Sequence, residues 1–329
     1  MKVLFIGGTG NISSAVSKLA SERGIDLYLL NRGLRSQGAD NAHTIHADIA
    51  NSSDTEILKE HKWDAVVNWI AFNENDIKRD YELFNGRTRQ YIFISSASCY
   101  QRPPRNYIIT ESTPLENPFW DYSRNKIKCE TLLNQLHKEK DFPATIIRPS
   151  HTYNTVIPLP VAAWTEYTAC DRIKRGKKVI VPGDGTSLWT LTHADDFASG
   201  FLGILGLPAA VGETFHITSD EVLSWNQIYE AIGNAFGKKT NMVHIPSDLL
   251  AHLNPELKGT LLGDKSYCAV FDNSKIKKFV PGYKAAIPFS EGIKRTIEWF
   301  EADPARRVVK KETNDFLDRT IDQFEKLFI

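Results

Sequence analysis

The chain has 329 residues, and its 40 lysines and arginines balance its 40 aspartates and glutamates, for a pI near 7.1. This neutral balance argues against the basic surface that binding to nucleic acid or to an acidic membrane requires. No apolar run approaches the ~20 residues of a membrane span. The four cysteines form no Cys-x-x-Cys pair, so we expect a cytoplasmic protein with reduced thiols.

The first ten residues, MKVLFIGGTG, join an apolar run to a cluster of glycines. This pattern predicts a buried strand over Lys2–Gly7, a turn, and a helix over Asn11–Glu22. Glycines in such a turn let the backbone approach a pyrophosphate closely, and the helix N-terminus offers N–H groups to its negative charge. The segment therefore predicts a dinucleotide site, with a plain tight turn as the alternative.

Short apolar runs and helical patterns alternate through the first half of the chain. The further predicted strands are Leu27–Leu30, His43–Ala47, Ala65–Ala71, Tyr91–Ser95 and Ala144–Arg148. The further predicted helices are Ser53–Lys62, Asn73–Phe84 and Trp120–Lys138. Repeated βα units predict an α/β fold with a doubly wound parallel sheet covered by helices on both faces.

The alternation becomes less regular after Pro149, where proline and glycine interrupt the chain. The predicted elements there are a strand at Glu213–Thr218, a helix at Trp225–Phe236, a strand at Asn241–Ile245 and a largely helical tail over Ser290–Phe328. We expect residues 1–155 to form a dinucleotide-binding domain and residues 156–329 mainly a smaller substrate-binding α/β lobe with C-terminal helices. Segments around 187–220 are expected to return to the first domain.

The end of the second predicted strand bears on the choice of cofactor. NAD sites usually offer a carboxylate here to the adenosine ribose, whereas this chain has Asn31 and Arg32, with Arg35 nearby. An arginine suits the 2′-phosphate of NADP, so we predict a preference for NADP over NAD; a surface role for Arg32 is the alternative. Asp48 follows the third strand and could accept a hydrogen bond from adenine or cap the helix near residues 51–54.

Tyr122 and Lys126 are four residues apart on a predicted helix, so their side chains share one face. A neighbouring ammonium favours the phenolate and lowers the tyrosine pKa. Tyr122 could then exchange a proton with a substrate hydroxyl or carbonyl while a nicotinamide exchanges hydride. Ser95 and Ser96 end the preceding strand, where a serine hydroxyl could face the same oxygen. The alternative is an exposed helical pair without a catalytic role.

These features together resemble the short-chain dehydrogenase/reductase superfamily, and within it the extended or atypical members that are similar to NAD-dependent epimerases and dehydratases. The residues that carry the resemblance are Gly7–Gly10, Asp48, Ser95–Tyr100, Tyr122 with Lys126, Arg148 with Pro149, Gly183–Gly185, His193–Asp196, Gly282 with Tyr283, Glu291–Ile293 and Trp299. The resemblance implies a Rossmann-type fold, an NADP or NAD cofactor, and a homodimer formed through the helices near residues 73–84 and 120–138.

The same resemblance implies a role for each matching residue. Tyr122 would be the acid/base, Lys126 would orient the nicotinamide ribose, and Ser96 would complete the catalytic set, with Ser98 as a second choice. The residues expected to bind the cofactor are Gly7, Gly8, Thr9, Gly10, Asn11, Ile12, Asn31, Arg32, Asp48, Ile49, Ala71, Tyr122 and Lys126.

The chain also departs from the family pattern. Ser13 stands where a third glycine is usual. Ala97 and Ser98 occupy the places of the acidic pair that drives elimination in family dehydratases, so dehydration is not expected. Trp189 stands nearest to an arginine that meets the diphosphate in nucleotide-sugar epimerases, and an indole stacks on rings but cannot neutralise phosphate. A standard nucleotide-sugar substrate is therefore not favoured.

Weaker signals lie in the second half of the chain. His151 and Tyr153 follow the last strand of the first half, at the sheet edge where ligands collect, and together with Ser98 and Trp189 they are candidate substrate residues; a loop-capping role for His151 is the alternative. His193 with two aspartates has the residue types of a metal site, but an apolar helix follows, so we expect Asp195 and Asp196 to be helix caps and no metal to bind. The amphipathic segment 316–328 is expected to pack on the protein or on a partner subunit.

We therefore expect an NAD(P)-dependent oxidoreductase or epimerase that transfers hydride at a carbinol carbon of a sugar-like or other small hydroxy or carbonyl compound. The alternative is a cofactor-binding interaction protein of the atypical short-chain type, for example one that binds RNA.

Overall fold

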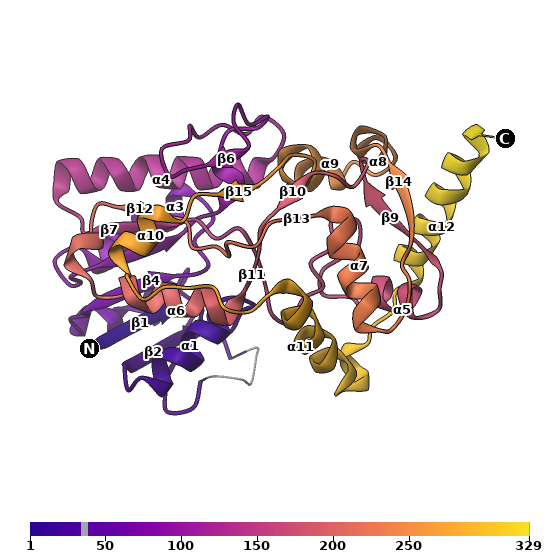
Figure 1. Cartoon of the computed structure of the whole chain (residues 1–329). Coiled ribbons are helices and arrows are strands. Elements are labelled where there is room, and N and C mark those ends of the chain that lie inside the picture. The colour runs from indigo at the N-terminus through magenta and orange to yellow at the C-terminus, as the bar shows by residue number, and fades with distance from the viewer. Residues whose placement is uncertain (34–38, 329) are drawn as a thin grey trace.

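In the computed structural model, which describes residues 1–33 and 39–328, a seven-stranded sheet lies at one end of the molecule and a smaller group of helices and short strands at the other (Figure 1). The strand order in the sheet is β12-β7-β5-β4-β1-β2-β3, and all of its neighbouring strands are parallel. Its strands are β1 (Lys2–Ile6), β2 (Asp26–Asn31), β3 (His43–His46), β4 (Ala65–Asn68), β5 (Tyr91–Ile94), β7 (Ala144–Ile147) and β12 (Thr214–Phe215). The predicted parallel α/β sheet is confirmed.

Helices cover both faces of this sheet because its strands are apolar on both sides. On one face, α1 (Ser13–Glu22) and α6 (Ala194–Ile204) pack on residues such as Val3 and Phe5. On the other face, α3 (Glu74–Phe84) and α4 (Asp121–Lys140) pack on residues such as Leu4 and Phe93. The late segments α6 and β12 thus lie with the first half of the chain, whereas a domain boundary at residue 155 stays a prediction.

Several predicted elements are shorter than the sequence pattern indicates; the strand predicted over Glu213–Thr218, for example, is limited to Thr214–Phe215. The fourth strand ends at Asn68 instead of Ala71, because the Asn68 side chain accepts a hydrogen bond from the backbone N–H of Ile70 at 2.8 Å and turns the chain. The helix predicted over Ser53–Lys62 is divided into α2 (Ser52–Thr55) and a 3-10 helix over Glu56–Glu60.

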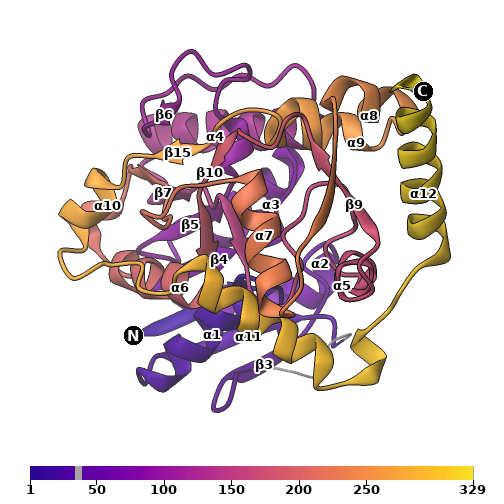
Figure 2. The same cartoon turned by 45° about the vertical axis from the view of Figure 1, so that its right-hand side comes forward.

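Outside the main sheet, the described residues form four two-stranded pairings: β6 (Ile108–Ile109) with β15 (Val270–Phe271), β8 (His151–Tyr153) with β11 (Leu191–His193), β9 (Lys178–Pro182) with β14 (Asn241–Ile245), and β10 (Leu188–Trp189) with β13 (Leu223–Ser224). The further helices of the second half are α5 (Thr168–Lys174), α7 (Trp225–Ala235), α8 (Ser247–Leu253), α9 (Leu257–Thr260), α10 (Ser274–Phe279), α11 (Phe289–Glu301) and α12 (Lys311–Glu325). Turning the molecule by 45° brings α7 and α11 in front of the sheet (Figure 2).

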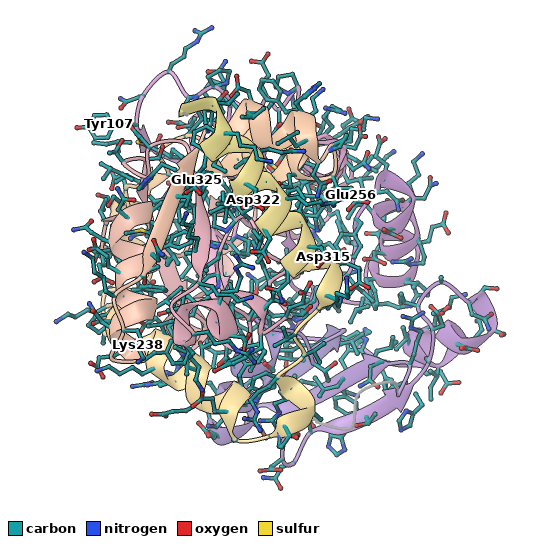
Figure 3. The ribbon with its side chains drawn as sticks, turned by 90° about the vertical axis from the view of Figure 1, so that its right-hand side faces the viewer. Tyr107, Lys238, Glu256, Asp315, Asp322 and Glu325 are labelled. Carbon is teal, nitrogen blue, oxygen red and sulfur yellow. The ribbon has the colours of Figure 1, made fainter. Side chains whose placement is uncertain are left out.

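The C-terminal helix α12 packs on the protein itself. Its apolar face buries Leu317 and Ile321 against Ile180 and Ile245, while its acidic side chains, among them Asp315 and Asp322, lie along the outer side of the helix (Figure 3). No helix in the described ranges is long and apolar enough to cross a membrane.

Candidate active site

A cavity of about 960 Å³ runs along the carboxyl ends of the parallel strands and continues into the second half of the molecule. Residues that follow β1, β2, β3, β4, β5 and β7 line it, so six strands of the sheet contribute to one wall. This is the edge at which open parallel sheets bind ligands.

The glycine turn between β1 and α1 has the backbone that the sequence predicts. Gly7 and Gly8 have φ angles of +95° and +105°, which L side chains rarely adopt. A Cβ on Gly8 would lie 2.8 Å from Leu29 Cδ2, so the turn is also closely packed. No side chain caps the N-terminus of α1 at Ile12, and this helix end lies at the cavity, where it can receive an anion.

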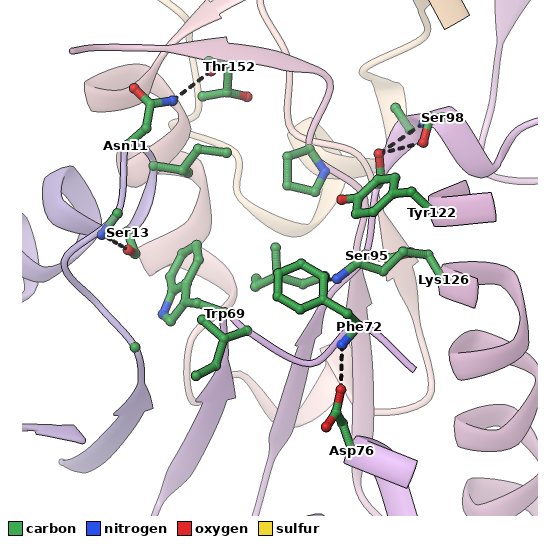
Figure 4. Close-up of a pocket in the computed structure, with 18 of the residues that line it drawn as sticks. Asn11, Ser13, Trp69, Phe72, Asp76, Ser95, Ser98, Tyr122, Lys126 and Thr152 are labelled. Carbon is green, nitrogen blue, oxygen red and sulfur yellow. Dashed lines mark hydrogen bonds between the residues drawn. The ribbon is translucent and has the colours of Figure 1, made fainter. Parts of the chain in front are cut away.

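Ser13 stands in place of the third glycine without loosening the turn. Its Oγ accepts a hydrogen bond from the backbone N–H of Gly10 at 2.8 Å. Asn11 ties the same turn to the segment around β8, because its Nδ2 donates to Thr152 O at 3.0 Å (Figure 4) and its Oδ1 accepts from the N–H of Thr155 at 3.2 Å.

The end of the cavity at β2 and β3 carries the residues that bear on cofactor choice. Asn31 Oδ1 accepts a hydrogen bond from the N–H of Gly33 at 2.9 Å. Arg32 is largely exposed and lies 3.9 Å from a carboxylate oxygen of Asp48. Asp48 does not cap the following helix, because Asn51 does; its Oδ1 accepts instead from the N–H of Ala50 at 3.0 Å. Arg35 lies outside the described residues.

Lys126 is buried at the centre of the cavity wall. Its Nζ donates hydrogen bonds to Ala71 O and Ile94 O, both at 2.7 Å, and lies 4.6 Å from the ring centre of Phe72. Burial lowers the pKa of Lys126 to about 8. Ala71 therefore contributes its carbonyl to Lys126, and it is not among the residues that line the cavity.

Tyr122 and Ser96 line the same wall of the cavity, where Tyr122 lies close to Ser98 (Figure 4). Burial raises the pKa of Tyr122 to about 12, opposed in part by a hydrogen bond to Ser96. The sequence predicts that Lys126 lowers the pKa of Tyr122. In the structure, desolvation of the phenol is the larger effect and raises this pKa, and Lys126 Nζ lies 5.8 Å from the tyrosine ring centre. The phenol is protonated at neutral pH.

Ser98 lies behind Ser96. Its Oγ is 2.9 Å from Ser96 Oγ and accepts a hydrogen bond from Ser123 Oγ at 2.7 Å. Ser98 is thus placed to orient Ser96, and Ser96 is the serine that reaches Tyr122.

The candidate substrate residues divide into two groups. Ser98, His151 and Trp189 line the cavity, whereas Tyr153 does not. Tyr153 is fully buried and packs against His193 and Phe289, away from the cavity. Tyr153 is therefore a core residue in this fold.

The motif His193–Asp196 begins α6, but the aspartates do not cap it. The cap is His193, whose Nδ1 accepts a hydrogen bond from the N–H of Asp195 at 3.2 Å. The Asp196 carboxylate instead accepts from the N–H groups of Ala286 and Ile287, both at 2.9 Å, and ties α6 to that loop. Within the described ranges, no cluster of His, Cys, Asp and Glu side chains is arranged to hold a metal ion.

Sequence reasoning did not find several residues of the far half of the cavity. They are Arg102, Trp120, Trp164, Asp264, Lys265 and Phe271. No local motif marks them, since Arg102 and Asp264 meet across 162 positions of the chain.

Comparisons with known proteins agree with this architecture. A 2′-dehydrokanamycin reductase from Streptomyces kanamyceticus is 22% identical over 298 residues, which cover 86% of this chain and 80% of the relative. The chloroplast stem-loop binding protein of 41 kDa b from Arabidopsis thaliana is 26% identical over 343 residues, with 97% and 84% covered. The solved UDP-glucuronic acid 4-epimerase from Bacillus cereus, in complex with UDP-glucuronic acid and NAD, superimposes with a TM-score of 0.72 at 18% identity, covering 92% of this chain and 99% of that one.

The model of the NAD dependent epimerase/dehydratase family matches residues 3–218, about two thirds of the chain, from the first strand past the edge strand β12. The matched range contains the glycine turn, Ser96, Tyr122 and Lys126. The protein belongs to the NAD-dependent epimerase/dehydratase family.

Proposed function

We propose that this protein is an NAD(P)-dependent oxidoreductase or epimerase that acts at a carbinol carbon of a sugar-like or other small hydroxy or carbonyl compound. The observation that carries the proposal is the convergence of the glycine turn, Ser96, Tyr122 and Lys126 on one cavity. A nicotinamide bound there supplies or accepts the hydride.

The residues present fit such a cofactor. The positive φ angles and close packing at Gly7 and Gly8 leave space for backbone but not for side chains, which is what a pyrophosphate at a helix N-terminus requires. Lys126, fixed by two carbonyls, is placed to hold the ribose next to the nicotinamide. Ile49 lines the adenosine end of the cavity with Asp48.

Tyr122 performs the proton transfer in this proposal. Because burial keeps its phenol protonated at neutral pH, Tyr122 is ready to donate a proton to a carbonyl oxygen that is being reduced. Ser96, which forms a hydrogen bond with Tyr122, orients the same substrate carbonyl oxygen toward the phenol. In the oxidative direction, Tyr122 must first lose its proton.

Dehydration is not favoured, because the two positions after Ser96 are Ala97 and Ser98 and neither carries an acid. The aromatic side chains of Trp120, Trp164 and Trp189 line the substrate end and offer flat apolar surfaces to a sugar ring. The relatives named for a reductase and for an epimerase support hydride transfer of one of these two kinds.

The proposal is tested with Tyr122→Phe, which keeps the ring and removes the hydroxyl. Turnover of a carbonyl substrate, measured through the oxidation of the reduced cofactor, should fall by roughly 10²- to 10⁴-fold, while the cofactor Kd is unchanged. Tyr107→Phe is the matched control, because Tyr107 is exposed and does not line the cavity. Unchanged turnover in Tyr122→Phe contradicts the proposed role.

A second candidate is an interaction protein that binds a nucleic-acid stem-loop, motivated by the name of the Arabidopsis relative. The balance of 40 basic and 40 acidic residues supports it less than it supports an enzyme. Filter binding to RNA across a salt series separates the two candidates, because a genuine RNA site shows saturable binding that weakens steeply with salt.

A further inference from the structure

At the far end of the cavity, three charged side chains form a buried cluster. Arg102, Asp264 and Lys265 all line the cavity, although the side chains of Arg102 and Lys265 are only 1% and 5% exposed. Arg102 Nη2 donates to one carboxylate oxygen of Asp264 at 3.2 Å, and Lys265 Nζ donates to the other. Two cations therefore share one carboxylate, which leaves an excess of one positive charge.

The hydrogen-bonding capacity of Arg102 is mostly unused. A guanidinium offers five N–H donors in a planar fork. In the part of the chain that the structure describes, Arg102 Nε and Nη1 have no hydrogen-bond partner. Buried donors without partners are unfavourable, and an anion in the cavity would relieve this.

Lys265 lies between this carboxylate and aromatic rings. Its Nζ is 4.5 Å from the ring centre of Trp189 and 5.5 Å from that of Trp164. These rings stabilise the ammonium through their π faces without neutralising it. The cluster therefore keeps its excess positive charge.

The neighbouring His151 adds no charge to the cluster. Its Nε2 donates to Pro158 O at 2.9 Å, so the neutral ring leaves Nδ1 as an acceptor. Burial, with a contribution from Lys265, lowers the pKa of His151 to about 3. Among the described residues, Nδ1 has no partner, so it can accept a hydrogen bond from a ligand hydroxyl.

The cluster is tied to the catalytic residues. Asp264 and Lys265 end a π-helical turn over Leu261–Lys265. Asn117 Nδ2 donates both to Gly263 O of that turn, at 2.7 Å, and to Ser98 O beside Ser96, at 2.8 Å. The Asp264 charge also contributes to the raised pKa of Tyr122. A group held by the cluster is therefore held at a defined position relative to Tyr122.

We propose that Arg102 and Lys265 form a subsite for an anionic group of the substrate, a carboxylate or a phosphate, while His151 Nδ1 accepts from a hydroxyl of the same molecule. This inference rests on the proposed function, because it places the substrate in the cavity next to Tyr122. A planar guanidinium pairs with either anion through two parallel hydrogen bonds. The substrate class is then a hydroxy acid, a sugar acid or a sugar phosphate.

The test measures binding and does not require the true substrate. The protein is first saturated with NADP or NAD, whichever binds more tightly, so that the glycine turn is occupied. Inorganic phosphate, glycolate and the neutral glycerol are then titrated by calorimetry, with tryptophan fluorescence as a second signal from Trp164 and Trp189. We expect phosphate or glycolate to bind and glycerol not to bind; binding by phosphate alone identifies a phosphate ester, and binding by glycolate alone identifies a carboxylate.

Arg102→Gln and Lys265→Gln should each weaken anion binding by roughly tenfold or more, since each removes a charge-assisted hydrogen bond. Arg172→Gln is the matched control: Arg172 is equally buried and paired with Asp318, but it lies outside the cavity. Asp264→Asn should tighten anion binding, because it removes the competing carboxylate, whereas a merely structural cluster would lose binding in this variant too. If Arg102→Gln does not fold, Lys265→Gln and Asp264→Asn decide the result.

The inference is overturned if neither anion binds, or if binding is the same in the two glutamine variants as in the unchanged protein. This outcome is distinguishable from failure of the proposed function. Anion binding that depends on Arg102, without turnover of any carbonyl or hydroxy compound, would support the anion subsite and contradict the proposed enzymatic function. Turnover of neutral compounds without anion binding would support the enzymatic function and contradict the subsite.

Discussion

Lys126 is a charged residue that is buried in the wall of the cavity. Its ammonium is nearly inaccessible to solvent, yet it donates to two backbone carbonyls and faces the rings of Phe72 and Phe93. Desolvation outweighs these contacts, so burial lowers the pKa of Lys126 to about 8 from 10.5. The folded protein therefore releases this proton more easily than the unfolded chain does.

This difference predicts a pH dependence of stability. Between pH 8 and pH 10.5 the unfolded chain keeps the Lys126 proton while the folded protein loses it, so the contribution of Lys126 to stability rises with pH across this window. Relative to Lys126→Met, the free energy of unfolding of the unchanged protein should rise by about 3 kcal/mol over that range. Urea unfolding at a series of pH values measures the difference.

Lys128→Met is the control for this experiment, because Lys128 is exposed on the same helix. We expect its difference from the unchanged protein to be flat across the same pH values. A flat difference for Lys126→Met as well would show that the ammonium is not desolvated.

Arg32 is the residue on which the proposed choice between cofactors depends. Its guanidinium is 64% exposed and lies 3.9 Å from Asp48, a weak contact for a surface pair that leaves the guanidinium available to a 2′-phosphate. Arg32→Gln should weaken NADP binding by about tenfold and leave NAD binding nearly unchanged. Fluorescence titrations with NADPH and NADH measure the two dissociation constants. Tighter binding of NADH than of NADPH by the unchanged protein would contradict the predicted preference for NADP.

At the scale of elements, the glycine turn joins a fully buried strand to the open end of a helix. Gly8 lies between Leu29 of β2 and Ser17 of α1, and Ser17 Oγ donates to Gly8 O at 2.9 Å. The turn is thus held by packing and by a side-chain hydrogen bond before any cofactor arrives. Such a preformed turn lowers the ordering cost of binding a pyrophosphate.

Gly8→Ala should disrupt this turn, because the new Cβ would lie 2.8 Å from Leu29 Cδ2 at a φ of +105°. We expect cofactor binding to weaken by roughly tenfold or more. The matched control is Gly86→Ala, which has a φ of +70° but no atom within 4 Å of the added Cβ. The Gly86→Ala variant should lose about 1 kcal/mol of stability and keep its cofactor affinity. Equal cofactor affinities in both variants would contradict a role of the glycine turn in cofactor binding.

Local patterns explain why so much of the first half could be predicted. Strand β1, its glycine turn and α1 are adjacent in sequence, and Tyr122 with Lys126 needs only one helical turn to share a face. Short strands outside the main sheet, such as β6 and β15, have only two residues each and too little length for a periodic signal. Their parallel pairing brings Ile108 beside Val270 and Ile109 beside Phe271, and no sequence pattern predicts it.

The charged cluster at the far end of the cavity was not predictable from the sequence, unlike His151 and Trp189, which line the cavity as expected. Arg102 and Lys265 are charged residues without a recognisable motif, in irregular and π-helical segments. Their partnership depends on tertiary contacts across the whole fold. The pKa of Tyr122 was likewise not predictable from spacing, because burial and not the nearby lysine dominates it.

At the scale of the whole molecule, the cavity lies where the sheet meets the second half of the chain. Asn11 ties the glycine turn to Thr152 and Thr155, and Asn117 ties the loop of Ser96 and Ser98 to the π-helical turn over Leu261–Lys265. Buried or half-buried hydrogen bonds therefore fix both ends of the cavity, and the bond from Asn117 to Gly263 O joins the two halves of the chain. Pairing of α3 and α4 with a second subunit stays a prediction.

The central claim is that a nicotinamide nucleotide binds at the glycine turn next to Tyr122. The measurement that tests it most directly is a titration of nucleotide-free protein with NADPH and with NADH, in which nicotinamide fluorescence reports binding. We predict saturable binding of one molecule per chain, tighter for NADPH, that is lost in Gly8→Ala and retained in Tyr122→Phe. Absence of saturable binding of either nucleotide would contradict the account.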